Sequence, residues 1–333
     1  MEGRNQQAHS DTSFRRIGQG FCGSVWAAEG DIIAMKREDG GPGRSILNDY
    51  NMLKRVLETV SQQGARIACV PRWPRFVHSD DSWWEKNLSR FPKGYTACNV
   101  LCSERIPRLP REVRDRLVDR YCPPPSVQTI KNNDADRDCL VRLYLGRRKI
   151  QQEARRGQNF FSLRNYPLHI NQAEELDLQV VDYAHAMAES LAVMHWTARI
   201  DANDVEFVLG GLQNTDTDTE ARTGEFTNDF FGSHSLWLLD FDCCKPLTMD
   251  DAGVEQAARA FLRNDPYFPR PASNRSSDYA LWQEFKGWYL ERSRPLVTSG
   301  HLSLPEKFIT RVEDLHEEAM QKRPADTSHR TSS

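Results

Sequence analysis

Two aspartates end the most apolar stretch of the sequence, LWLLDFDCC, and they are the first candidates for chemistry. Leu236 to Leu239 predict a buried strand, which would deliver Asp240 and Asp242 to its end. Carboxylates in that position can close a turn or bind a hard cation such as Mg²⁺. Asp240 is therefore a candidate metal ligand.

A second acidic segment, RIDANDVE, follows a long predicted helix and precedes the apolar stretch FVLG. Asp201 stands where the pattern H-R-D-x-x-x-x-N has its catalytic base, and Glu206 replaces the metal-binding asparagine. A carboxylate also binds Mg²⁺, so Glu206 is a second candidate metal ligand. The histidine and arginine of the pattern are missing. A polar turn built by Asp201 and Asn203 is the alternative interpretation.

Upstream, Gly18, Gly20, Gly23 and Val25 form the pattern G-x-G-x-x-G-x-V. Glycines let the backbone approach a phosphate closely, and exposed N–H groups favour anions. A dinucleotide-binding motif needs a helix after the third glycine, but the following Ser-Val-Trp-Ala-Ala favours a strand. The pattern therefore indicates a kinase-type hairpin over the phosphates of ATP.

The next predicted strand ends at Lys36 and matches V-A-I-K, whose lysine contacts nucleotide phosphates. A strand-end lysine that reaches into solvent is the alternative. Asp49 lies on a helix predicted from Ser45 to about Val60, where a glutamate usually steadies this lysine. An ion pair with Lys36 and a solvated helix carboxylate explain Asp49 equally well.

The elements that must position these residues predict an α+β, two-lobed, protein-kinase-like fold. We expect an N-lobe at 13–107, with a small antiparallel sheet and one main helix, and a mostly helical C-lobe at 108–322. Disordered tails are expected at 1–12 and 323–333, polar loop insertions near 123–137 and 213–229, and a flexible link at 40–43. Other expected elements are strands at 95–107 and 139–146, helices at 110–121, 174–196, 250–263, 277–292 and 305–321, and a hairpin of FVLG with LWLL.

Composition limits the class of protein. The chain has 333 residues and a formal net charge of −3, so it gives no global electrostatic reason to expect a nucleic-acid or membrane partner. No apolar run reaches the length of a membrane span, and the N-terminus lacks the apolar core of a signal peptide. The eight cysteines show no zinc-finger spacing and favour a reduced environment. An intracellular, cytoplasmic location is therefore expected.

The order of these motifs resembles the protein-kinase-like superfamily, and from Asp201 onward the aminoglycoside- and choline-phosphotransferase branch. That resemblance implies that Glu104 lies in the linker where backbone groups meet adenine. A second resemblance, to an uncharacterised fungal family carrying a domain-of-unknown-function label, runs from about Ile17 to the C-terminal helices. Some members are described as zinc-finger-associated, and the resemblance implies a fungal origin but no activity. Its segments are SERIPRLP, CLVRLYLGRR, FFSLRNYPLHI, MHWTARIDANDVEFVLGG and LWLLDFDCC.

Two functions stay open at this point. In the first, the chain is a phosphotransferase that uses ATP and Mg²⁺, with Asp201 as the base for a hydroxyl of a small molecule or protein. In the second, it is an inactive pseudokinase-like scaffold that binds a protein partner, with or without nucleotide. Lys36, Asp201 and Asp240 favour the enzyme, whereas the missing pattern residues, including the glycine replaced by Asp242, favour the scaffold. The acceptor is not specified by the sequence.

Overall fold

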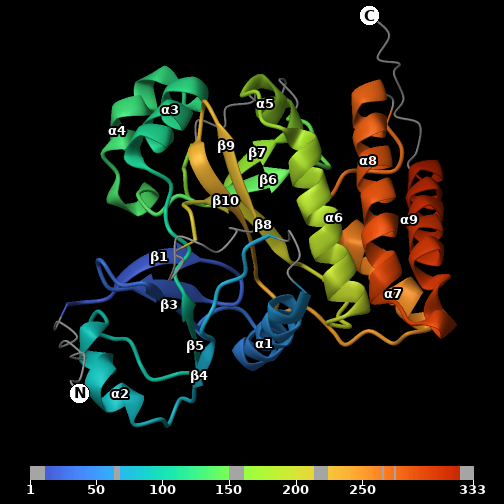
Figure 1. The fold of residues 1–333 in the computed structure, drawn as a ribbon. Coiled ribbons are helices and arrows are strands. Elements are labelled where there is room, and N and C mark those ends of the chain that lie inside the picture. Colours follow the sequence, from blue (N-terminus) through green and yellow to red (C-terminus); the bar gives the residue numbers. More distant parts are fainter. Residues whose placement is uncertain are drawn as a thin grey trace, which may run out of the picture.

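The computed structural model describes residues 12–63, 68–149, 161–213, 224–264, 266–273 and 275–322. Over these residues the chain folds into two five-stranded sheets surrounded by helices, which is the mixed α+β class expected from the sequence. The two sheets lie one above the other in Figure 1, and most of the helices cover the second sheet. In the described part of the chain, no helix is long and apolar enough to cross a membrane.

The N-terminal sheet has the strand order β1-β2-β3-β5-β4, and its described pairs are antiparallel. Helix α1 packs against this sheet through an apolar stripe in which Leu53 and Val56 are buried. The same helix carries Asp49 toward the sheet. The elements are β1 (Arg15–Gln19), β2 (Ser24–Ala27), β3 (Ile33–Arg37), α1 (Ile46–Gln63), β4 (Arg75–Val77), α2 (Trp83–Asn87) and β5 (Val100–Glu104).

The glycine-rich segment at 40–43 differs from the predicted flexible link. The N–H of Gly40 donates to the carbonyl of Cys22 over 3.2 Å, and that of Gly41 donates to the carbonyl of Phe21 over 2.8 Å. A Cβ on Gly40 would lie 2.3 Å from the Phe21 carbonyl oxygen, so only glycine permits this approach. The segment therefore packs onto the tip of the turn between β1 and β2, at residues 20–23, which we call the glycine turn.

The second sheet has the order β7-β6-β8-β10-β9, and the predicted pairing of FVLG with LWLL forms its centre as the antiparallel strands β8 and β10. The two strands are not a simple hairpin, because strand β9 lies between them in the chain, within the range predicted as a loop. Leu239 lies opposite Glu206, so β10 ends and β8 begins at the same end of the sheet. Strand β6 pairs antiparallel with β8, so β6 also ends at that end of the sheet. The strands are β6 (Val141–Tyr144), β7 (Tyr166–His169), β8 (Glu206–Gly210), β9 (Glu225–Asn228) and β10 (Gly232–Leu239).

Two sequence predictions differ from the helices observed around this sheet. The long helix predicted over 174–196 is broken where Asp177 takes a left-handed φ of 53°. The polar insertion near 123–137 contains α4 and short 3₁₀ turns as well as loop. Most of the 213–229 insertion and nearly all of both predicted tails lie outside the described residues. The helices are α3 (Arg111–Tyr121), α4 (Val127–Lys131), α5 (Ile170–Glu175), α6 (Val180–Trp196), α7 (Asp251–Arg263), α8 (Ser276–Ser293) and α9 (Leu304–Gln321).

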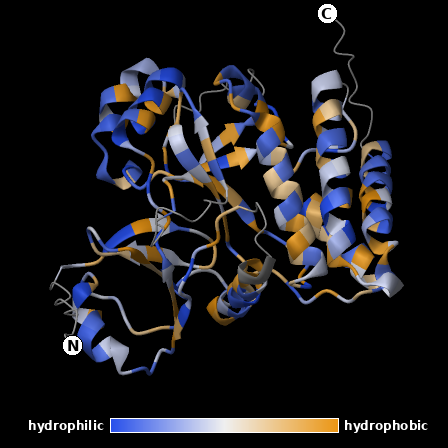
Figure 2. Cartoon of the chain, viewed as in Figure 1, coloured by the Kyte–Doolittle hydropathy of each residue, from blue (hydrophilic) through white to orange (hydrophobic). Residues whose placement is uncertain are grey.

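Helix α6 is the centre of the larger core, because all its side chains from Ala186 to Trp196 are buried. Helices α7, α8 and α9 each carry apolar residues on part of their surface and hydrophilic residues on the rest, as Figure 2 shows. His195 is fully buried in this core, and its Nδ1 lies 2.9 Å from the Tyr289 hydroxyl. Burial lowers the pKa of His195 to about 3, so the ring is neutral at pH 7.

This buried histidine should make stability depend on pH. The unfolded chain binds a proton at His195 near pH 6.5, but the folded chain does so only near pH 3. The free energy of unfolding should therefore fall as the pH drops below 6.5, by about 2 kcal/mol from this group between pH 7 and pH 5. Urea unfolding of the wild type and His195→Gln at both pH values measures it. The variant should lose that share of the pH dependence, and an unchanged difference between the two pH values would contradict the assignment.

Candidate functional site

A partly buried ion-pair network lies where the two sheets meet: the side chains of Asp49, Lys36 and Asp240 are 4%, 18% and 24% exposed. Lys36 Nζ is 2.6 Å from Asp49 Oδ2 and 2.6 Å from Asp240 Oδ1. The three side chains come from β3, α1 and the residue that follows β10. The N–H of Phe241 also donates to Asp49 Oδ1 over 3.1 Å. The Lys36–Asp49 pair that the sequence left open is thus present, and one lysine ties helix α1 to the end of β10.

The pKa values of the three groups in this network depend on burial and on the attraction between Lys36 and the two carboxylates. Burial opposes the charge on Lys36, but Asp49 and Asp240 outweigh it and raise the pKa of the lysine. Burial also opposes the charge on Asp240, yet Lys36 holds the pKa of that carboxyl below its ordinary value. For Asp49, burial prevails and raises the pKa. Asp240 takes a left-handed φ of 68°, an uncommon conformation that aspartate adopts more readily than most residues.

A cavity of about 200 Å³ adjoins the network, between the glycine turn and the end of the second sheet at which β10 ends and β8 begins. Its lining includes all of the site residues predicted from the sequence except Asp201. Segments far apart in the chain therefore converge on one space, as their motifs suggested. The predicted residues that line it are Gly18, Gly20, Gly23, Val25, Lys36, Asp49, Glu104, Glu206 and Asp240.

Gly20 and Gly23 of the turn differ in what surrounds them. The N–H of Gly20 donates to the carbonyl of Gly23 over 2.9 Å and closes the turn. A Cβ on Gly23 would lie 1.9 Å from the Arg37 carbonyl oxygen, so this glycine is required by the protein's own packing. A Cβ on Gly20 would meet nothing within 4 Å. Gly20 is thus the position where open space remains beside the backbone.

The two glutamates of the cavity are held by arginines. Glu206 Oε1 lies 2.6 Å from Arg142 on the neighbouring strand β6, and burial raises the pKa of Glu206 to about 7. Glu104 accepts from Arg72 Nε and Nη2 over 3.0 and 2.9 Å, and from Gln213 over 2.9 Å. The carboxylate of Glu104 therefore anchors neighbouring segments, although the residue lines the cavity.

Asp201 is only 2% exposed and does not line this cavity. Its Oδ1 accepts from the N–H of Lys245 over 2.9 Å, and its Oδ2 accepts from Gln256 over 2.8 Å. The N–H of Asp201 in turn donates to the carbonyl of Lys245 over 3.0 Å. The same loop has left-handed φ values at Arg199, Ala202 and Asp204, so it stores backbone strain. The structure fixes Asp201 within a strained loop beside residues 245–247.

Sequence reasoning missed Arg44, which joins the glycine-rich segment 40–43 to the loop at 201–205 (the acidic loop) and to the residues after β10. Its Nη1 lies 2.8 Å from Asp204 Oδ2, 2.9 Å from Asp242 Oδ1 and 2.6 Å from Cys243 Sγ. Its guanidinium also lies 5.2 Å from the centre of the Phe21 ring, at the tip of the glycine turn. No local motif marks this arginine, because its partners lie far along the chain. Asp242, unexplained in the sequence, is therefore a buried partner of Arg44.

Comparison with known families concerns one part of the chain. Residues 236–301 match the DUF3669 family, whose description is zinc finger protein. This segment resembles a domain of unknown function. It begins within β10, contains Asp240 and Asp242, and extends beyond α8. No curated protein matches the sequence.

The zinc named in that description does not fit the side chains found here. Within the described ranges, one group of three potential ligands comes together, formed by Asp204, Asp242 and Cys243. A structural zinc site takes four ligands, predominantly cysteine and histidine, whereas this group offers one thiol and two carboxylates. All three side chains also contact the cationic Arg44. The residues thus form an arginine-centred cluster.

Replacing Arg44 should show how much the cluster contributes to stability. Arg44→Met leaves the Asp242 carboxylate, which is 1% exposed, without its guanidinium, and should lower the free energy of unfolding by about 3 kcal/mol. Asp204→Asn is the matched control, because this side chain is 50% exposed and its pair should contribute about 1 kcal/mol or less. Urea unfolding gives both values. An Arg44→Met effect no larger than that of Asp204→Asn would show that the buried pair does not stabilise the fold.

Proposed function

We propose that the chain is a kinase-like protein that binds a nucleotide with Mg²⁺ beneath the glycine turn and acts as a non-catalytic scaffold. The observation that carries the proposal is the convergence of Lys36, Asp49 and Asp240 at one cavity lined by the glycine turn. A lysine steadied by a helix carboxylate, with an aspartate nearby, is the arrangement that kinase-type sites use for Mg·ATP. The order of the elements, a small sheet with one main helix followed by a largely helical part, supports a two-lobed kinase-like fold.

The donor set of the cavity suits Mg²⁺ bound to a nucleotide. Asp240 and Glu206 both line the space, and carboxylate oxygens are the ligands that this ion prefers. Because Asp240 is paired with Lys36 and Glu206 with Arg142 in the unliganded protein, the ion would have to compete with these two cations. When bound, the ion would neutralise phosphate charge. Lys36 would contact a phosphate, and the backbone at Gly20 would face it. Glu104 ends β5, where backbone groups would meet the base.

The size of the cavity requires a movement on binding. Its volume of about 200 Å³ is smaller than the roughly 300–1,000 Å³ typical of small-molecule sites. The tip of the glycine turn is docked by Gly40 and Gly41, and Arg44 packs beside Phe21. Nucleotide entry would therefore have to lift the turn together with these contacts.

The environment of Asp201 favours the scaffold over the enzyme. A general base must reach the proton that it removes, but both carboxylate oxygens of Asp201 already accept hydrogen bonds from within the protein. A phosphotransferase is the second candidate, because the Asp201 loop pairs with Lys245, close in sequence to Asp240 and Asp242. Such an enzyme would need Gln256 to release the carboxylate for a hydroxyl acceptor.

Nucleotide binding can be tested by unfolding the protein with ATP and Mg²⁺. At free Mg·ATP 100-fold above Kd, we expect about 2.7 kcal/mol of added stability. Asp240→Asn should remove the dependence on Mg²⁺. Gly20→Ala should leave the unliganded protein equally stable but weaken binding several-fold, because its methyl group would project into open space. The absence of stabilisation by ATP, ADP or Mg²⁺ would reject the proposed binding.

Phosphate release from ATP, with water as the acceptor, detects turnover that the scaffold proposal excludes. The scaffold proposal expects no turnover above background in the wild type. Turnover that Asp201→Asn abolishes while ATP binding persists would show phosphoryl transfer that depends on Asp201 and would contradict the scaffold. Gln256→Ala serves as a second variant, because it removes a hydrogen bond to Asp201 without changing the carboxylate. Activity gained only in Gln256→Ala would show that this hydrogen bond is what keeps Asp201 from acting as a base.

A further inference from the structure

A cavity of about 600 Å³ lies on the face of the first sheet that points away from Lys36. Met35 of β3 pairs with Cys102 of β5, and Cys102 pairs with Arg75 of β4. Directly opposite residues lie on the same face of an antiparallel sheet, so these three side chains share one face, and all three line the cavity. Lys36 follows Met35 in β3 and therefore points to the opposite face. The sheet thus separates this cavity from the one at Lys36.

Helix α2 covers only part of this face, because it has five residues. Trp84 of α2 belongs to a small apolar cluster with Met35 and Cys102, whereas Leu53 of α1 belongs to the larger core. Figure 1 shows α1 and α2 on opposite sides of the first sheet. The cavity remains beside α2, and its volume lies within the roughly 300–1,000 Å³ typical of small-molecule sites.

Trp73 forms an aromatic wall of the cavity. It is 46% exposed and takes a left-handed φ of 56°, an uncommon conformation for a bulky residue. The guanidinium of Arg72 lies 4.6 Å from the centre of the Trp73 ring, and two hydrogen bonds to Glu104 fix Arg72 in turn. Backbone conformations of this kind are concentrated at ligand-binding sites. The ring is therefore a fixed, open surface on which a flat ligand can stack.

Three cations line the cavity, and none of them has a carboxylate partner in the described part of the chain. The side chains of Arg75 and Lys86 are exposed there and make no hydrogen bond or ion pair. Arg90 donates to a backbone carbonyl and to an amide oxygen, both over 3.0 Å, and its guanidinium lies 3.9 Å from the centre of an aromatic ring. Because all of these groups are neutral, the positive charge of Arg90 is not offset either.

Little negative charge faces these cations. Among the described residues that line the cavity, Asp31 is the single carboxylate, and its Oδ1 accepts from the N–H of Ile33 over 3.1 Å. Burial raises the pKa of the Cys102 thiol to about 11, so Cys102 is neutral at pH 7. Three cations and one carboxylate give the lining a net charge of +2, in a chain of net charge −3.

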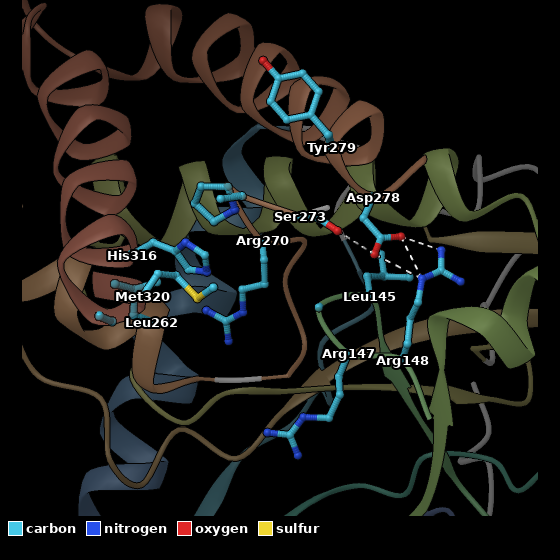
Figure 3. A pocket seen from close by; sticks show the side chains of 14 residues that line it. Leu145, Arg147, Arg148, Leu262, Arg270, Ser273, Asp278, Tyr279, His316 and Met320 are labelled. Carbon is cyan, nitrogen blue, oxygen red and sulfur yellow. Dashed lines mark hydrogen bonds and ion pairs between the residues drawn. The ribbon is translucent and has the colours of Figure 1, made fainter. Parts of the chain in front are cut away.

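A larger cavity, of about 750 Å³ among the C-terminal helices, differs in this respect. Figure 3 shows the arginines that line it, Arg147, Arg148 and Arg270. Arg148 is paired with Asp278, and the other two arginines also have partners within the protein. That cavity therefore has no free cation to offer to an anion.

We propose that the cavity beside Trp73 binds a planar aromatic anion, with its ring against Trp73 and its acidic group near Arg75 and Lys86. Aromatic rings stack favourably on one another, and cationic side chains form charge-assisted hydrogen bonds with carboxylates, sulfonates and phosphates alike. Small inorganic anions have no apolar surface to bury against Trp73 and Met35. The site does not depend on the nucleotide proposal, because the two cavities share no lining residue.

Two naphthalene compounds test this site by isothermal titration calorimetry on the full chain. Naphthalene-2-sulfonate carries the negative charge, and 2-naphthalenemethanol has the same ring with a neutral group. We expect the sulfonate to bind at least fivefold more tightly than the alcohol. Arg75→Gln and Lys86→Gln should each weaken the sulfonate at least twofold and leave the alcohol unchanged, and the double variant should remove the preference.

Trp73→Gly tests the stacking surface separately. Glycine adopts a φ of 56° without strain, so this variant removes the ring without imposing a new conformation on the backbone. It should weaken both compounds at least fivefold. Unchanged affinity for both compounds in Trp73→Gly would overturn the proposed stacking.

The matched control is Lys93→Gln, which removes an exposed lysine that does not line the cavity. It should bind both compounds as the wild type does. Equal affinity for the two compounds, no binding of the sulfonate, or a loss in Lys93→Gln as large as that in Lys86→Gln would overturn the proposal. Circular dichroism identifies any variant that fails to fold. Arg75→Gln and Lys86→Gln replace exposed side chains without partners, so these two variants decide the result.

Discussion

The contact on which the structure depends is the partly buried Lys36 ammonium between Asp49 and Asp240. It is the point where strand β3, helix α1 and the end of β10 meet. Burying one cation with two carboxylates is favourable only when the geometry is good, because each group loses its hydration. The left-handed backbone at Asp240 is consistent with that demand, since strain persists where surrounding structure fixes it. The cavity, the glycine turn and the acidic loop are all arranged around this contact.

A second connection supports the first from the side of the glycine turn. Arg44 reaches Asp204, Asp242 and Cys243, and its segment is docked onto the turn through Gly40 and Gly41. The two connections together fix the glycine turn and the end of β10 beside the small cavity. The binding of a nucleotide, as proposed, would have to loosen the second connection while keeping the first. Stability and access to the site are therefore linked.

Sequence patterns predicted much of this, for identifiable reasons. Local periodicity was sufficient for α1 and for the pairing of β8 with β10, although strand β9 between them was missed. The order of the motifs assigned Lys36 and Asp240 to one site, and the two side chains are in contact. Contacts between side chains that lie far apart in the sequence could not be predicted from it. The hydrogen bond from Gln256 to Asp201 and the contacts of Arg44 have no periodic signature. The helix break at Asp177 was missed because the segment 174–179, EELDLQ, contains no glycine or proline that would mark the end of a helix.

The most direct test of the central claim is a double-mutant cycle between Lys36 and Asp240, measured by urea unfolding. Lys36→Met and Asp240→Asn are made singly and together. If the lysine joins the two sheets through this aspartate, the coupling free energy should be about 1 kcal/mol or more, and the double variant should lose less than the sum of the singles. Additivity within about 0.5 kcal/mol would show that the two residues do not interact, and would contradict the account.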